Sequence, residues 1–140
     1  MPLSESDGRN FQGVTSRDRA IAAAKTALDY RANDVVILDL RALTSQFDYF
    51  VIVSGTSRRQ LHGVSEEIDH VLENQLGDKR LSIAGFQESK WIVLDYGDIV
   101  IHLFEPETRE FYALEELWGK GVPVPINDSV ILDSEKGHLE

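Results

Sequence analysis

The spacing of apolar residues predicts a helix and two strands in the first part of the chain. Between residues 15 and 31, apolar positions recur three and four residues apart, which is typical of a helix with one buried face. Thr15 and Asp18 offer a capping box at its start, and Asn33 is a plausible stop. Continuous β-favouring runs at 35–38 and 49–53 predict two strands that are buried on both faces.

A second helix and a short strand follow these two strands. Ser57, with Gln60 three residues further on, is expected to cap the helix. Its apolar stripe runs through residues 61–72, and Gly77 is expected to end it. Residues 80–86 predict a short strand that ends in a turn at Gly85.

The stretch from Trp91 to Trp118 carries the most distinctive pattern, which begins with a predicted β-hairpin. If Tyr96 and Gly97 form its loop, Asp95 faces Asp98 and Trp91 faces His102. One face of this hairpin is then entirely aliphatic, and the other mixes large apolar groups with ionisable ones: Trp91, Val93, Asp95, Asp98, Val100, His102 and Phe104. The mixed face suits the recognition of a partner, but more chain could equally cover it, with the Asp pair stabilising only the turn.

Pro106 predicts the start of a third helix, because proline fits the first helical position. In a continuous helix Phe111, Leu114 and Trp118 lie on one stripe, joined by Leu117. We therefore expect a disordered arm over residues 1–14, one domain over 15–119 and a flexible tail over 120–140. The order of elements predicts an α/β fold, a single-domain α/β sandwich with a mixed sheet.

Composition narrows the classes of function. With 140 residues and 42% hydrophobic residues, the chain can bury a sizeable core, and it contains no Cys. It lacks a run long enough to span a membrane and the pattern of a signal peptide, so we expect a cytoplasmic protein without a membrane partner. A net charge of −10 disfavours direct, sequence-specific nucleic-acid contact. Residues 105–118 hold five acids and one base, which favours a protein partner with a basic surface, although the acids could also be a solvated helix face.

Three groups of residues invite a chemical interpretation. Ser54-Gly55-Thr56-Ser57 lies between a strand and a helix, as a phosphate-binding turn would, but it lacks the Walker sequence. Nucleotide transfer would also need two carboxylates on one strand to hold Mg²⁺, and no predicted strand carries Asp-x-Asp. His62, Glu66 and His70 share a helix stripe opposite the apolar one, where no further ligand supports a metal. His102 could pair with Asp95 or Asp98 as acid and base, yet no nucleophile accompanies it. We expect no enzyme activity, no metal site and no cofactor. The alternative is a nucleotidyltransferase-like enzyme that binds a nucleoside triphosphate through the Ser54 turn, with Asp95 and Asp98 holding a metal.

Several spaced segments together resemble one known family. They are Asp48–Ile52, Ser54–Ser57 with Gln60, Trp91–Asp98, Val100–Phe104, Arg109–Tyr112, and Leu114-Glu115 with Leu117-Trp118. In this order they resemble the ribosomal silencing factor family, RsfS or Iojap-like, over roughly residues 16–119. The family often has an acidic residue where this chain has Ala84.

The resemblance implies a translation repressor with a fold similar to the nucleotidyltransferase superfamily but lacking its metal carboxylates. Such proteins bind the large ribosomal subunit through its fourteenth ribosomal protein and block joining of the small subunit; a homodimer is also associated with the family. A partner-binding surface in this chain would take its anchors and charges from the hairpin and the helix after it: Trp91, Asp95, Tyr96, Asp98, His102, Phe104, Glu110 and Tyr112.

Overall fold

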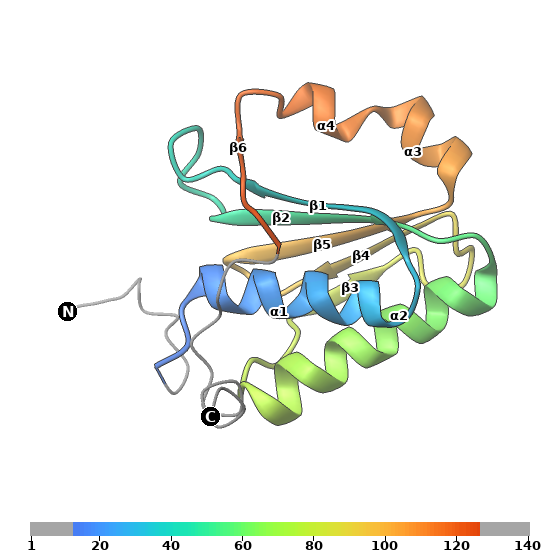
Figure 1. Cartoon of the computed structure of the whole chain (residues 1–140), viewed down its shortest axis with the longest axis horizontal. Helices are drawn as coiled ribbons and strands as arrows, with labels where there is room; N and C mark the ends of the chain where they lie inside the picture. The colour runs from blue at the N-terminus through green and yellow to red at the C-terminus, as the bar shows by residue number, and fades with distance from the viewer. Residues whose placement is uncertain (1–12, 127–140) are drawn as a thin grey trace.

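The computed structural model describes residues 13–126 as a six-stranded mixed sheet with helices on both faces (Figure 1). The helices are α1 (Ser16–Asp29), α2 (Arg58–His70) with its π-helical extension η1 (Val71–Gln75), α3 (Pro106–Tyr112) and α4 (Leu114–Leu117). The strands are β1 (Asn33–Asp39), β2 (Tyr49–Ser54), β3 (Ser82–Ala84), β4 (Trp91–Asp95), β5 (Ile99–Phe104) and β6 (Val122–Pro123). The predicted α/β class, the mixed sheet and the order of the longer elements are confirmed.

The sheet has the order β3-β4-β5-β2-β1-β6, with β5 and β2 at its centre. These two strands run parallel and every residue in them is buried, while the other neighbouring strands are antiparallel. β1 is only partly buried, because just two residues of β6 pair with its outer side. The prediction of a strand buried on both faces therefore holds for β2 and fails for β1.

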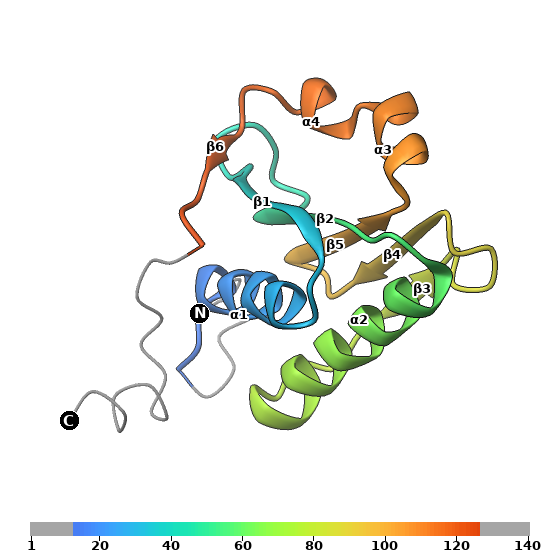
Figure 2. The same ribbon diagram turned by 45° about the vertical axis from the view of Figure 1, so that its right-hand side comes forward.

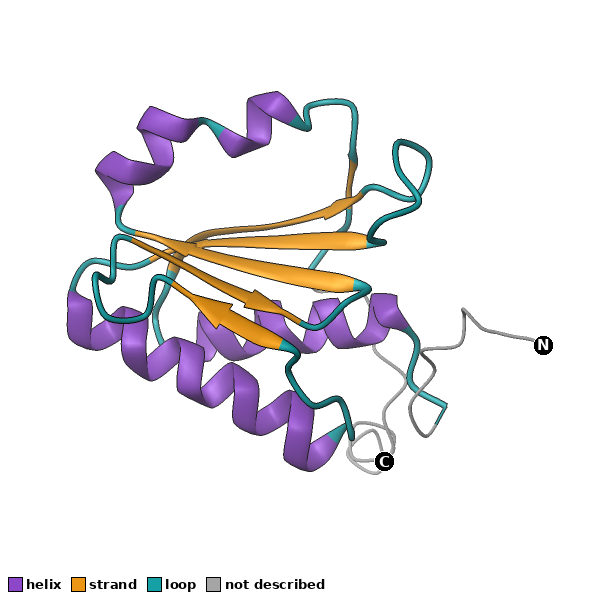
Figure 3. Cartoon of the chain, turned by 180° about the vertical axis from the view of Figure 1, so that it is seen from behind, coloured by secondary structure: helices purple, strands orange, loops and turns teal. Residues whose placement is uncertain are grey.

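Two helical layers of different size enclose the sheet. α1 and α2 lie side by side across one face, and the short helices α3 and α4 lie over the other, nearest β1 and β2 (Figures 2 and 3). The larger core lies under α1 and α2, where five alanines of α1 let that helix come close to the strands. A smaller core on the other face contains Leu38, Phe50, Ile52, Val100, Phe104 and Leu114. It is this thinner side that leaves side chains available to a partner.

The helix caps follow the sequence closely. Thr15 Oγ1 accepts from the Asp18 N–H at 3.1 Å, and Ser57 Oγ accepts from the Gln60 N–H at 3.0 Å. Each of these bonds satisfies a backbone donor that the first helical turn leaves open. α1 ends earlier than predicted, because Arg31, with φ 66°, takes the left-handed conformation expected of Asn33, which already belongs to β1.

The hairpin register predicted from the sequence is wrong by two residues. Asp95 pairs with Val100 and Trp91 with Phe104, and the loop is Gly97-Asp98. It is closed by the Tyr96 N–H, which donates to the Ile99 carbonyl at 3.0 Å.

Two side chains stabilise this shifted loop. Asp95 Oδ1 accepts from the Gly97 N–H at 2.8 Å, and Asp98 is bound by the buried guanidinium of Arg19. A shift of two residues leaves every side chain on its original face, so the sorting into an aliphatic and a mixed face stays correct for the paired residues.

The end of the domain also differs from the prediction. A single helix through Trp118 is wrong: Ala113 takes the left-handed conformation at φ 48° and ψ 48° and separates α3 from α4. The expected tail begins with ordered residues, since β6 pairs with β1 and Val124 packs against the larger core. Of the expected N-terminal arm, residues 1–12 lie outside the described part, as do residues 127–140 of the expected tail.

A candidate protein-docking surface

Aromatic side chains form a continuous row across the sheet face under α3 and α4. We call this row, Phe47, Phe50, Trp91, His102, Phe104, Tyr112 and Trp118, the aromatic seam. Its ring centroids lie 4.5–6.3 Å apart along the chain of contacts. Distances in this range are typical of favourable aromatic packing. The seam runs from Trp118 beyond α4 to Tyr112 at the end of α3, and so ties both short helices to the sheet.

The centre of the seam is a hydrogen-bonded Trp–His pair. Trp91 Nε1–H donates to His102 Nδ1 at 3.1 Å, so a neutral His102 carries its proton on Nε2. That Nε2 is buried and has no hydrogen-bond partner among residues 13–126. Burial lowers the pKa of His102 to about 4, because a charged imidazole would lose its hydration there. The ring is therefore neutral near pH 7 and acts as an acceptor for Trp91.

The predicted anchors differ widely in their exposure. Phe104 and His102 are buried and Trp91 is half-buried. Tyr112 is 52% exposed and packs against Trp91, with the ring centroids 4.7 Å apart and the planes tilted by 45°. Phe104 and His102 thus form the floor of the surface, while Trp91 and Tyr112 can reach a partner directly. Glu110 is also exposed, on α3 two residues before Tyr112.

Tyr96, which the sequence predicted as one of the partner-binding residues, is not accessible to a partner. Its side chain is fully buried in the larger core on the α1–α2 side, and its hydroxyl donates to Asp69 Oδ1 at 2.8 Å. Burial, with the neighbouring carboxylate, raises the pKa of Tyr96. The shifted hairpin loop is the cause, because it makes Tyr96 a closing residue of the turn whose ring points to the helices.

The two aspartates of the hairpin are held by contacts within the chain. Asp95 caps the turn through Gly97. Asp98 accepts from both terminal nitrogens of Arg19, at 3.1 and 2.6 Å, and Arg19 also pairs with the buried Asp78. Both aspartates are half-buried, so the acidic charge that a partner meets comes chiefly from the α3–α4 side.

Two exposed apolar residues were not among the predicted anchors. Phe111 on α3 is 80% exposed and Leu117 on α4 is 75% exposed, the highest values among the large apolar residues of 13–126. In a continuous helix both would share one apolar stripe with Leu114, which is buried, and would be expected to face the same way. The bend at Ala113 reverses that expectation, and alanine gives no sequence signal for a left-handed residue.

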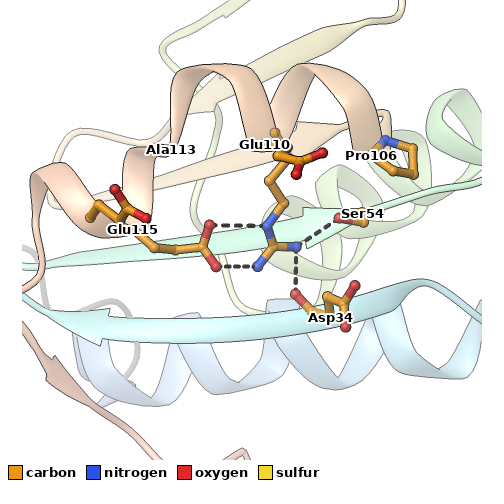
Figure 4. Close-up of a pocket in the computed structure, with 8 residues that line it drawn as sticks. Asp34, Ser54, Pro106, Glu110, Ala113 and Glu115 are labelled. Carbon is orange, nitrogen blue, oxygen red and sulfur yellow. Dashed lines mark hydrogen bonds and ion pairs between the residues drawn. The ribbon is translucent and has the colours of Figure 1, made fainter.

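A buried arginine fixes this bend. Arg109 binds the Glu115 carboxylate through Nε and Nη2, at 3.1 and 2.7 Å, and so bridges α3 to α4 (Figure 4). Its Nη1 donates to the Asp34 carbonyl at 2.6 Å and to Ser54 Oγ at 2.7 Å, at the ends of the strands. The ion pair lowers the pKa of Glu115. The short helices are therefore attached to the sheet at a defined angle.

The residues of the enzymatic alternative are engaged in other contacts. The Ser54 hydroxyl accepts from Arg109, the Thr56 N–H donates to Gln60 Oε1 at 2.7 Å, and Ser57 caps α2. With Asp95 and Asp98 also bound internally, neither half of a metal–phosphate site is free in this arrangement. The geometry gives the enzymatic alternative no support.

His62 does not lie on a fully solvated stripe as predicted. Its ring stacks on Phe86 at 3.9 Å, and its Nε2 lies 2.6 Å from both the Phe86 carbonyl and Ser89 Oγ. Within residues 13–126, no group of three or more His, Asp or Glu side chains is arranged to hold a metal ion. The same part of the chain contains no helix that is both long and apolar enough to cross a bilayer.

The fold and the surface thus define a small α/β domain with an aromatic seam beneath two short acidic helices. The family described as "Ribosomal silencing factor during starvation" matches residues 14–138. This chain belongs to that family.

Individual relatives agree with this assignment. The ribosomal silencing factor RsfS of Bacillus subtilis is 39% identical over 98 residues, which cover 69% of this chain and 81% of that protein. The RsfS of Zymomonas mobilis is 37% identical, over 74% of this chain and 78% of its own length. The mouse protein named mitochondrial assembly of ribosomal large subunit protein 1 is 38% identical over 62% of this chain and 39% of its own.

Solved structures agree in fold. A crystal structure from Chromobacterium violaceum superposes with a TM-score of 0.71 at 26% identity, covering 82% of this chain and 94% of that one. A crystal structure from Bacillus halodurans superposes with a TM-score of 0.64 at 30% identity, covering 74% of this chain and 92% of that one.

Proposed function

We propose that this protein binds the large ribosomal subunit through the fourteenth ribosomal protein of that subunit and blocks joining of the small subunit. Translation would fall because fewer complete ribosomes form. Membership of the ribosomal silencing factor family is the observation that carries this proposal. The name of the mouse relative, which refers to assembly of the large ribosomal subunit, agrees with the same partner.

The docking surface supports a mechanism based on binding alone. Trp91 and Tyr112 pack against each other and are accessible, and aromatic residues of this kind dominate the energy of many interfaces. Glu110, exposed on the same helix as Tyr112, offers negative charge to a basic partner. A rigid domain held at the subunit interface would exclude the small subunit sterically, without a chemical step or a cofactor.

Co-sedimentation with isolated ribosomal subunits tests the proposal. The protein should pellet with large subunits and stay in the supernatant with small subunits. Tyr112→Ala should weaken pelleting by at least about tenfold in apparent Kd, because it removes an exposed aromatic anchor. Tyr30→Ala is the matched control, since Tyr30 is 46% exposed at the end of α1 on the opposite face of the sheet. Pelleting with neither subunit would refute the proposal.

A further inference from the structure

Two large apolar side chains are exposed on residues 106–117, the segment that contains α3 and α4 and that we call the α3–α4 arm. Phe111 and Leu117 are 80% and 75% exposed, although a continuous helix would have placed both on its inward stripe. Single exposed apolar residues are common on protein surfaces, but two of this size on the twelve residues of an acidic segment are unusual. The outward orientation depends on the bend between the two helices.

The bend is both strained and reinforced. A non-glycine residue in the left-handed region, such as Ala113, is unfavourable and persists only where the surrounding structure stabilises it. Arg109 supplies that stabilisation with its two bonds to Glu115 and its bonds to Asp34 and Ser54 (Figure 4). The arm is therefore rigid before it binds, which lowers the entropic cost of association.

The exposed charges of the arm around the two apolar residues are all negative. Glu107, Glu110 and Glu116 are exposed on the arm. The one base of the arm, Arg109, is buried, and its charge is matched by Glu115. A partner that accepts the apolar residues must therefore offer positive charge around them.

We propose that the α3–α4 arm inserts Phe111 and Leu117 into apolar hollows that are bordered by lysine or arginine side chains on the partner protein. The inference rests on the proposed function, and it assigns the strongest contacts to the arm, beyond the half-buried Trp91 of the hairpin. Arg109 is a positioning residue for this contact, because it holds the bend without facing the partner.

Binding of truncated variants to purified large subunits tests the assignment. Phe111→Ala and Leu117→Ala should each raise the apparent Kd tenfold or more. Leu81→Ala is the matched control, because Leu81 is 62% exposed just before β3, the edge strand farthest from β6, and its Kd should stay within about twofold of wild type. All three side chains are largely exposed, so circular dichroism should show unchanged folding.

Charge reversal tests the chemistry of the partner. Glu110→Lys and Glu116→Lys should weaken binding at low salt and reduce its dependence on salt concentration. Glu73, which is exposed on η1, is the control position, and Glu73→Lys should change neither the binding nor its salt dependence.

The outcomes separate this inference from the function on which it rests. If wild-type protein binds large subunits and the Phe111 and Leu117 variants bind equally well, the arm assignment is wrong and the proposed function stands. If wild-type protein does not bind at all, both are wrong. If the two variants instead dissociate a dimer while subunit binding is unchanged, the arm contacts a second copy of the chain and the inference is overturned.

Discussion

Acidification should destabilise this domain through one buried histidine. His102 has a pKa of about 4 in the folded protein, against 6.5 for the free side chain. The unfolded chain therefore binds a proton more readily than the folded one, so the stability that this group provides is complete above pH 6.5 and is lost as the pH falls towards 4. Each pKa unit between the folded and the unfolded chain corresponds to about 1.4 kcal/mol of stability. The difference between 6.5 and about 4 therefore gives a total loss of about 3 kcal/mol, of which about 2 kcal/mol is lost by pH 5.

Between pH 7 and pH 5, the contribution of His102 can be separated from that of the carboxyl groups whose pKa is lowered by folding. Asp39 and Glu115 both have a pKa below its ordinary value of 3.8 or 4.5, so their contributions are lost only at more acidic pH. Urea unfolding at pH 7, 6 and 5, followed by far-ultraviolet circular dichroism, gives the free energy of unfolding at each pH.

A variant without a titrating group at this position provides the comparison. His102→Phe keeps an aromatic ring against Phe50, whose centroid lies 4.5 Å from that of His102, and should remove about 2 kcal/mol of the fall between pH 7 and pH 5. Its absolute stability can differ from wild type, since Trp91 loses its acceptor, but only the difference in slope matters. Equal slopes for wild type and variant would show that His102 does not cause the loss of stability, as would an NMR titration of His102 with a pKa near 6.5.

Substitutions at three further positions should lower the free energy of urea unfolding at pH 7. Tyr96→Ala should cost about 3–5 kcal/mol, as is usual for a buried aromatic residue, and Tyr96→Phe should cost about 1 kcal/mol because it removes the hydrogen bond to Asp69. A loss of less than about 1 kcal/mol in Tyr96→Ala would mean that the side chain is not buried in the core. Gly85→Ala should cost at least about 2 kcal/mol, because Gly85 has φ +76° and an added Cβ would lie 2.0 Å from the Trp91 carbonyl oxygen; an unchanged midpoint would contradict that geometry. Ser57→Ala should cost about 1 kcal/mol by removing the cap of α2, and Ser57→Asp should restore most of it; equal loss in both variants would mean that the cap contributes nothing.

The sequence predicted most of the fold because its local signals agree with the tertiary structure. The caps at Thr15 and Ser57, the buried strand β2 and the turn at Gly85 all follow from residue type and spacing. The two faces of the hairpin were also sorted correctly despite the wrong loop. Side chains alternate with a period of two along a strand, and the register error was two residues, so no side chain in the paired strands changed face.

The site was harder to predict because it depends on contacts between distant residues. The loop that buries Tyr96 is stabilised by Arg19 from α1, which lies 79 positions before its partner Asp98. The outward turn of Phe111 depends on Arg109, whose partners include Asp34 and Ser54. Similarly, β6 has only two residues, one of them a proline, and forms because β1 offers a free edge. None of these contacts leaves a local pattern in the sequence.

A subunit-joining assay is the most direct test of the account. Purified large subunits, incubated first with the protein and then with small subunits, would be separated on a sucrose gradient to measure joined ribosomes. Steric exclusion of the small subunit predicts that the number of joined ribosomes falls as the protein is added. Tyr112→Ala should need at least about tenfold more protein for the same effect, and Tyr30→Ala should behave as wild type. If joining is unchanged at protein concentrations that saturate the large subunit, the steric mechanism is contradicted.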